Sequence, residues 1–399
     1  MTTRRTAPRR LRLLFTFAGG SGHLEPLLPL ARTAKAVGHA VAFAARPWMV
    51  PKVEALGFAA FGAGSDTGLT PVRRPLVAVD VEADIQDLGH GFGRRIARER
   101  AAGLLPLCEM WRPDLVVCEE TDFGALVVAE ALGLPYATVL VIAEGSFVRP
   151  DAIAGPLDEV RAVYGLPPDP TLAALGRYLV LSPFPPGFRN PAAPLPATSH
   201  GFRAMPSDAD PDDAPAWLAS LRDAPTVYLT LGTIYNVESG DLFQRALAGL
   251  RDLPVNLIVT VGRDIDPAEL GPQPAHVHVE GYVPQALLLP HCDLVVCHGG
   301  SGSTMGALSY GLPLVLLPLG ADQPLNAARC ETLGVGVALD VITATPLQIR
   351  DAAVAVLGDP GYRIAARRLR DEIAALPPPD EAVARLVRLA EDKSPRLVP

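Results

Sequence analysis

The chain has 399 residues, of which 49% are hydrophobic and 20% are charged, so it is long enough for two domains with large cores. Its formal net charge of −8 argues against nucleic acid as the main partner and against binding to a strongly anionic membrane surface. The five cysteines lack C-x-x-C spacing and lie mostly in apolar runs, which predicts reduced core residues of a cytoplasmic protein, not a disulfide framework or a zinc site. They are Cys108, Cys118, Cys292, Cys297 and Cys330.

The first ten residues are basic and contain two Arg-Arg pairs. The apolar run that follows, residues 11–18, contains Arg12 and is short for the core of a secretion signal. We therefore expect a disordered tail that leads into a first β-strand. No apolar run reaches the ~18 residues that a membrane span needs.

Residues 11–44 predict a strand, a glycine-rich turn, a helix and a second strand. The strand at 11–17 is followed by the turn Gly-Gly-Ser-Gly-His at 19–23, a helix over 24–37 and a strand over 40–44. Gly38 lies just past the helix, as expected at a helix C-terminus. This order predicts a parallel, doubly wound α/β sheet.

The remainder of the first half alternates between apolar strands, helices and two irregular stretches. Residues 62–93 and 144–176 are rich in Gly, Pro and charge, which predicts long loops. Strands are predicted to end near residues 118, 142 and 182. Helices are predicted over residues 92–111 and 123–132. The proline-rich and acidic stretch 185–224 predicts a linker between domains.

The second half contains a second turn of the same kind. Strands are predicted at 226–231, 257–262 and 277–280, and a buried strand at 294–297 runs into His-Gly-Gly-Ser-Gly-Ser-Thr at 298–304, before a helix over 305–310. Glycines let a backbone approach a ligand, and the first turn of a helix offers unpaired N–H groups that suit phosphate. The alternative is a tight turn that only packs a helix. The turn fits neither the P-loop nor the dinucleotide pattern.

The sequence around this turn carries a family resemblance. Gly-Tyr-Val-Pro-Gln at 281–285 lies upstream, and Leu-Leu-Pro-Leu-Gly-Ala-Asp-Gln-Pro-Leu-Asn-Ala at 316–327 lies downstream. Together these segments resemble the nucleotide-sugar-binding signature of glycosyltransferases with the GT-B fold, and most closely the actinobacterial enzymes that decorate natural products. The resemblance implies two Rossmann-like domains whose parallel sheets face each other across a cleft.

The resemblance also implies a division of the chain into three parts. Residues 1–205 are expected to bind the acceptor and residues 206–378 the nucleotide sugar. Residues 379–399 are expected to form a helix that crosses back onto the first domain.

For the donor, the resemblance implies residues that bind the base, the diphosphate and the sugar. Tyr282, Val283 and Gln285 are expected at the base, although Tyr282 could be ordinary packing. Asp322 and Gln323 are expected to hold sugar hydroxyls, the alternative being a simple turn before a proline. The groups expected at the nucleotide phosphates are Thr233, His298, Gly299, Gly300, Ser301, Gly302, Ser303 and Thr304.

For the acceptor, the family context Gly-His-x-x-Pro implies that His23 is the general base, because the pKa of histidine lies near neutrality. A histidine in such a turn could also be structural. An acid on the other ring nitrogen would fix the tautomer of the imidazole. The resemblance places this acid at Glu119, with Glu120 as the alternative.

With these residues, the resemblance implies an inverting transfer of a sugar, deoxysugars included, from a dTDP- or UDP-sugar to a hydroxyl of a small apolar aglycone. No metal or cofactor is expected: the only Asp-x-Asp spacing considered, Asp208 and Asp210, lies in the linker. Three alternatives stay open: a lipid- or sterol-directed glycosyltransferase, a sugar-nucleotide epimerase and a non-catalytic nucleotide-sugar-binding protein. The oligomeric state is open as well, a homodimer included.

Overall fold

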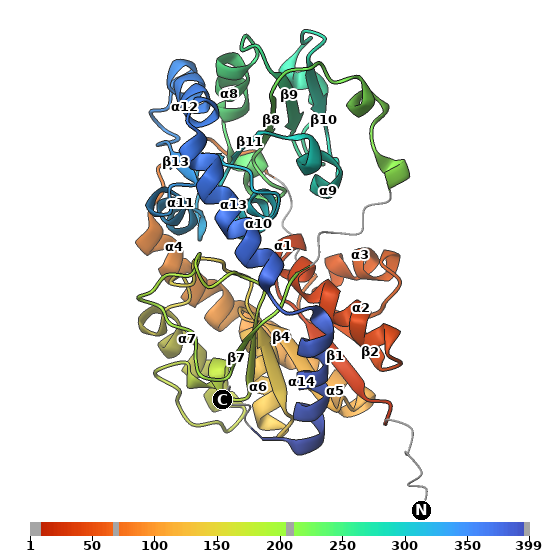
Figure 1. The fold of residues 1–399 in the computed structure, drawn as a ribbon. Coiled ribbons are helices and arrows are strands. Elements are labelled where there is room, and N and C mark those ends of the chain that lie inside the picture. The colour runs from red at the N-terminus through yellow and green to blue at the C-terminus, as the bar shows by residue number, and fades with distance from the viewer. Residues whose placement is uncertain (1–8, 67–71, 205–210, 395–399) are drawn as a thin grey trace, which may run out of the picture.

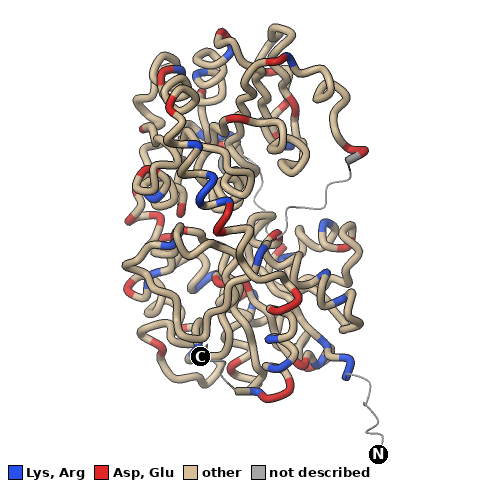
Figure 2. The backbone as a smooth tube through the Cα atoms, viewed as in Figure 1, with Lys and Arg blue, Asp and Glu red and all other residues tan. Residues whose placement is uncertain are grey.

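The computed structural model describes residues 9–66, 72–204 and 211–394, and it contains two parallel sheets in two halves of the molecule (Figure 1). The basic tail up to residue 8 and the Asp208–Asp210 pair lie outside the described residues. Acidic and basic residues are interspersed over both halves (Figure 2). Across the described ranges, no helix combines the length and the apolar character that crossing a membrane requires.

The first sheet has seven parallel strands in the order β3-β2-β1-β4-β5-β6-β7. The order reverses between β1 and β4, which pair with Thr16 beside Cys118, so both strands end at the same edge of the sheet. In doubly wound sheets ligands bind at such a switch point. The strands are β1 (Arg12–Thr16), β2 (Ala40–Ala45), β3 (Ala59–Gly62), β4 (Leu115–Glu119), β5 (Tyr136–Val139), β6 (Leu179–Ser182) and β7 (Ser199–Gly201).

The second sheet has six parallel strands in the order β10-β9-β8-β11-β12-β13. Its order reverses between β8 and β11, where Thr230 pairs with Cys297. Both strands are buried along their whole length, as expected for parallel strands covered by helices on two faces. The strands are β8 (Thr226–Thr230), β9 (Asn256–Thr260), β10 (Val277–Glu280), β11 (Leu294–Cys297), β12 (Leu314–Leu316) and β13 (Gly336–Ala338).

Helices cover both sheets. Those of the first half are α1 (Ser21–Leu24), α2 (Leu28–Ala36), α3 (Val50–Ala55), α4 (Val81–Leu88), the π-helix η3 (Gly89–Ile96), α5 (Ala97–Trp111), α6 (Phe123–Ala131) and α7 (Pro150–Val163). Those that follow β8 are α8 (Leu242–Leu250), α9 (Gln285–Leu288), α10 (Ser301–Ser309), α11 (Gln323–Thr332), α12 (Pro346–Gly358), α13 (Pro360–Ala375) and α14 (Pro379–Asp392).

Helix α14 packs on the first sheet, although it comes from the other end of the chain. Figure 1 shows α13 running from the second half toward the first, where α14 lies. Ala382, Leu386 and Leu389 on α14 are fully buried in one core with residues of β1 such as Leu13 and Phe15. Full burial of each leucine contributes roughly 1.5–3 kcal/mol of hydrophobic free energy. The last described helix therefore completes the core of the first half.

The prediction of long loops over 62–93 and 144–176 is wrong in part, because α4, η3 and α7 lie there. Asp80 caps α4 by accepting the N–H of Ala83, a start signal that the surrounding charge concealed. Gly89 belongs to a helix contact, since a Cβ there would lie 2.2 Å from the carbonyl oxygen of Ala152 on α7. The glycines that suggested a loop allow two helices to pack closely instead.

Two further predictions concern turns and cysteines. The helices after the two glycine-rich turns begin earlier than expected, at Ser21 and Ser301, so residues 21–23 of the first turn and 301–304 of the second are helical. All five cysteines are buried and free, which confirms the prediction of thiols in the core.

Candidate active site

His23 and Glu119 meet at the switch point of the first sheet. His23 lies on α1, directly after β1, and Glu119 is the last residue of β4. The Nδ1 atom of His23 is 3.2 Å from Oε1 of Glu119, and the hydroxyl of Thr121 lies 3.3 Å from the same nitrogen. The side chain of Glu119 is fully buried, whereas that of His23 is 27% exposed. The pair thus has a buried acid and an imidazole that solvent or a substrate can reach.

The carboxylate of Glu119 is held in place by several donors. It accepts the backbone N–H groups of Ala18 (3.2 Å) and Thr121 (2.7 Å), as well as the hydroxyl of Thr121. Burial alone would raise the pKa of Glu119, but His23 and these donors hold the pKa below its ordinary value. Burial would likewise lower the pKa of His23, but the charge and hydrogen bond of Glu119, together with the charges of Asp322 and Glu120, raise the pKa above its ordinary value.

Since Nδ1 of His23 faces the carboxylate, Nε2 is the nitrogen that remains to take up a proton. Two neighbours shape the space around the ring. A Cβ on Gly19 would lie 2.2 Å from Cδ2 of His23, so only glycine leaves room for the imidazole there. The ring of Phe92 stacks on it at a centroid distance of 5.8 Å and an interplanar angle of 5°.

Glu120 has a different role from its neighbour. Its Oε1 atom accepts the backbone N–H groups of Val141 and Ile142, in the loop after β5. Burial raises the pKa of this carboxyl to about 7, with the Arg189 cation and the two backbone donors acting in the opposite direction. The structure thus pairs Glu119 with His23 and uses Glu120 to hold a loop.

The second glycine-rich turn places a helix N-terminus beside His298. Gly299 has a φ of +83°, a conformation that favours glycine, and α10 begins two residues later. The His298 ring lies between Gly232 and Gly300, where a Cβ would come within 2.7 and 2.5 Å of Nε2. Burial lowers the pKa of His298 to about 4, so the ring is neutral near pH 7.

The hydroxyl groups expected at the phosphates are used in different ways. Ser301 donates to Oδ2 of Asp322 (2.6 Å), and Ser303 accepts from Nε2 of Gln285 (3.2 Å). The Oγ1 atom of Thr304 is buried without a partner among the described residues, and its N–H is bonded to the carbonyl of Gly300. As arranged, Thr304 offers neither group to a ligand. The backbone N–H groups of the first turn of a helix, by contrast, have no acceptor within the helix and can donate to a ligand.

The residues expected near the base differ in exposure. Tyr282 is 42% exposed, and the guanidinium carbon of Arg263 lies 4.0 Å from the centre of its ring. Val283 is buried, and Thr233, just after β8, is exposed. A base that stacks on Tyr282 would therefore meet Arg263 as well.

Asp322 lies where the second half faces His23. Its charge contributes to the raised pKa of His23, while burial raises the pKa of Asp322 itself. Oδ2 of Asp322 accepts from Ser301 and from Nδ2 of Asn326 (2.8 Å). Gln323 is buried, and its Oε1 accepts the N–H of Leu319 (2.7 Å), so this oxygen is used within the protein.

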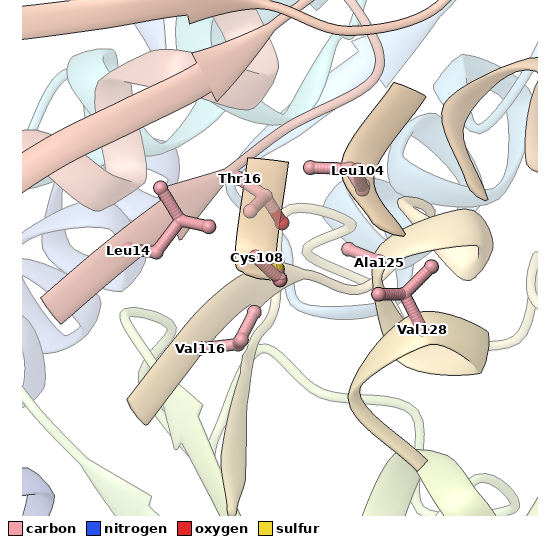
Figure 3. Close-up of a pocket in the computed structure, with 7 residues that line it drawn as sticks. All are labelled: Leu14, Thr16, Leu104, Cys108, Val116, Ala125 and Val128. Carbon is pink, nitrogen blue, oxygen red and sulfur yellow. The ribbon is translucent and has the colours of Figure 1, made fainter. Parts of the chain in front are cut away.

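A pocket of the first half lies away from these groups. It is lined by the seven residues in Figure 3: Leu14, Thr16, Leu104, Cys108, Val116, Ala125 and Val128. This void between β1, β4, α5 and α6 has no room for a water molecule and is a packing defect of the core. The described part of the chain also brings together no three His, Cys, Asp or Glu side chains that could hold a metal ion.

The structure thus gathers His23, Glu119, Ser301 and Asp322 around one place between the halves. Sequence reasoning assigned no role to Phe92, Arg263 and Asn326. Asn326 could have been found from its spacing, because it follows Asp322 by four residues and so shares a helix face with it. Phe92 had no such signal, since the packing of η3 decides where its ring lies.

Comparisons with known proteins show what the chain is similar to. Residues 244–389 match the family model described as Erythromycin biosynthesis protein CIII-like, C-terminal domain. The chain is 29% identical to 3-alpha-mycarosylerythronolide B desosaminyl transferase of Saccharopolyspora erythraea, over 95% of this chain and 98% of that protein. It is 31% identical to L-demethylnoviosyl transferase of Streptomyces niveus, over 92% and 96%.

Among solved structures, spinosyn rhamnosyltransferase SpnG complexed with thymidine diphosphate is similar over 95% of this chain and 100% of its own. The TM-score is 0.77 and the sequence identity 26%. These matches and the two parallel sheets confirm the fold class that the sequence predicted.

Proposed function

The chain belongs to the GT-B glycosyltransferases that attach sugars to natural-product aglycones, and we propose that within this family it is an inverting enzyme. Its proposed donor is a dTDP- or UDP-sugar, and its proposed acceptor is a hydroxyl of a small apolar aglycone. The dTDP-sugar is favoured, because the similar rhamnosyltransferase was solved with thymidine diphosphate. Deoxysugars are included, since the similar S. erythraea enzyme is named for desosaminyl transfer.

The observation that carries the proposal is the His23–Glu119 pair, which faces Asp322 from the other half. In the proposed reaction, Nε2 of His23 takes the proton of the acceptor hydroxyl. Glu119 stabilises the imidazolium that forms, as a buried carboxylate does in other histidine bases. The acceptor oxygen then attacks the anomeric carbon from the face opposite the diphosphate, and the configuration inverts in one displacement.

The leaving nucleoside diphosphate gains negative charge as its bond to the sugar breaks. The N–H groups at the start of α10 and the neutral ring of His298 are donors that suit this charge. Asp322 suits sugar hydroxyls, because Ser301 and Asn326 both donate to its Oδ2 atom and neither donates to Oδ1. We expect these groups to act without an added metal ion.

The experiment combines ligand binding with transfer. A thermal-shift screen in EDTA compares dTDP, UDP, GDP, ADP and NAD, and stabilisation by dTDP or UDP is expected because a ligand that binds only the native state raises Tm. The His23→Ala variant should keep this stabilisation and lose ~10²–10⁴-fold in transfer, the usual cost of losing a general base. Unchanged transfer in the variant would remove His23 from the mechanism.

The same screen separates the alternatives. A response to NAD alone, or to no nucleotide, would contradict the donor site. Stabilisation by dTDP or UDP with no transfer to any acceptor would favour a binding protein, and interconversion of the donor sugar would favour an epimerase. Transfer only to lipids or sterols would favour a lipid- or sterol-directed glycosyltransferase.

A further inference from the structure

Four consecutive backbone N–H groups in the loop after β5 each donate to a side chain. We call residues 141–144 the amide loop. The first two, of Val141 and Ile142, donate to Glu120 within the same half. The next two cross to the other half: Ala143 donates to Oγ of Ser301 (2.8 Å) and Glu144 to Oδ1 of Asn326 (3.1 Å). The amide loop therefore joins the half that holds His23 to the half that holds Asp322.

Among the three side chains that accept these N–H groups, Asn326 makes the most hydrogen bonds. Its side chain is fully buried, and its Nδ2 atom donates to the carbonyl of Gly299 (2.9 Å), Oδ2 of Asp322 (2.8 Å) and Oγ of Ser301 (3.2 Å). A carboxamide has one acceptor oxygen and two N–H hydrogens. Here the oxygen accepts an N–H from the first half, and the NH₂ group donates to acceptors in the second half. One amide group therefore binds both halves of the molecule.

The segment that carries Asp322 is held from the first half at a second point. Ala321 has a φ of +54°, which is uncommon for a residue other than glycine, and its N–H donates to Oδ2 of Asp84 on α4 (2.9 Å). The loop next to Asp322 therefore depends on contacts from the first half on both sides, at Asp84 and at the amide loop.

We propose that Asn326 is a positioning residue that orients Asp322 toward the donor sugar when the amide loop is docked against it. This inference rests on the proposed function for the role of Asp322. Docking of Glu144 on Oδ1 fixes the amide plane of Asn326. The fixed plane aims Nδ2 at Asp322 and at the turn that starts α10. The contact that holds the two halves together therefore also aligns Asp322 for the donor sugar.

Two substitutions separate the two sides of the amide group. Asn326→Ala removes both, so the N–H of Glu144 loses its acceptor and Asp322 loses one of its two side-chain donors. Asn326→Asp keeps an oxygen for the N–H of Glu144 but places a second carboxylate beside Asp322. Asn256→Ala is the matched control, because Asn256 is also buried and accepts one N–H while its Nδ2 donates to three oxygens, away from the site.

The first measurement is hydrogen exchange of the full-length protein, followed on a peptide that covers the amide loop. Asn326→Ala should raise the exchange rate at Glu144 at least tenfold, whereas Asn326→Asp and Asn256→Ala should leave the rate within twofold of the parent. Equal exchange at Glu144 in the parent and in Asn326→Ala would overturn the docking.

The second measurement is transfer kinetics together with binding of dTDP. Both Asn326 variants should lose at least tenfold in kcat while the Kd of dTDP changes less than threefold, because the diphosphate donors on α10 remain. Asn256→Ala should keep kcat per folded molecule. Equal losses of kcat in Asn326→Asp and Asn256→Ala would overturn the positioning role. If Asn326→Ala fails to fold, Asn326→Asp carries the test.

Failure of the two proposals is distinguishable. If the parent protein binds neither dTDP nor UDP, the proposed function fails, and the exchange experiment still decides whether Asn326 docks the amide loop.

Discussion

At the level of single residues, the chemistry of the site depends on which group faces each nitrogen of His23. The family resemblance gave Glu119 as its partner and left Glu120 as the alternative, and the structure places Glu119 at the end of β4, beside β1 at the switch point. Composition and spacing could not decide between Glu119 and Glu120. Neighbouring residues at a strand end point in different directions, and only the path of the loop after β5 shows that Glu120 binds the amide loop.

The raised pKa of His23 gives the first prediction at this level. Protonated His23 cannot accept a proton, so kcat/KM should fall as the pH drops through the pKa of His23. In Glu119→Gln the charge that raises this pKa is lost and burial dominates. The acid limb of the pH profile should then move to lower pH, and the plateau should fall at least tenfold.

The comparison variant is Glu120→Gln, whose carbonyl can still accept the two loop N–H groups. Its acid limb should stay close to that of the parent, since Glu120 contributes least of the groups that raise the pKa of His23. An acid limb that does not move in Glu119→Gln would show that another group titrates in the profile.

At the level of elements, strands were predicted better than helices. The run at 294–297 matches β11 residue for residue, because a short apolar segment between turn residues fits a buried parallel strand. Helix α7 and the start of η3, residues 89–91, were missed, since their glycines and prolines are typical of loops in isolation. What makes them helical is their packing on each other, and contacts between distant segments cannot be read from local composition.

The turn after β1 gives a prediction for such an element. In Gly19→Ala the new methyl group would overlap the ring of His23, so the imidazole should be displaced and transfer should fall at least tenfold while dTDP still binds. Gly22→Ala is the control, because a Cβ there meets no heavy atom within 4 Å and Gly22 lies in α1. Similar transfer rates in the two variants would contradict the steric role of Gly19.

At the level of the whole molecule, hydrogen bonds join the two halves, and each half supplies both donors and acceptors. The fold class could be predicted from two strand–turn–helix patterns, because each pattern specifies a parallel sheet. The contacts of Asn326, Asp84 and the amide loop could not, as they depend on how the two halves meet. The sequence therefore predicts each half of the site better than the junction between them.

Helix α14 gives the prediction for the whole molecule. Leu386→Ala removes a fully buried side chain from the core of the first half and should lower the free energy of unfolding by about 2–5 kcal/mol. Urea unfolding measures this change. Ile364→Ala on α13, where the side chain is 51% exposed, is the control and should change stability by less than about 0.5 kcal/mol. Equal stabilities would mean that α14 contributes little to this core.

The position of α14 also has a consequence for the synthesis of the chain on the ribosome. The strands of the first sheet are complete once residue 201 has been made, but the helix that covers Leu13 and Phe15 ends at residue 392. At ~5–20 residues per second, the nascent first half waits roughly 10–40 s with part of its apolar surface uncovered. During that interval the chain offers a binding surface to chaperones, and release of α14 from the exit tunnel ends it.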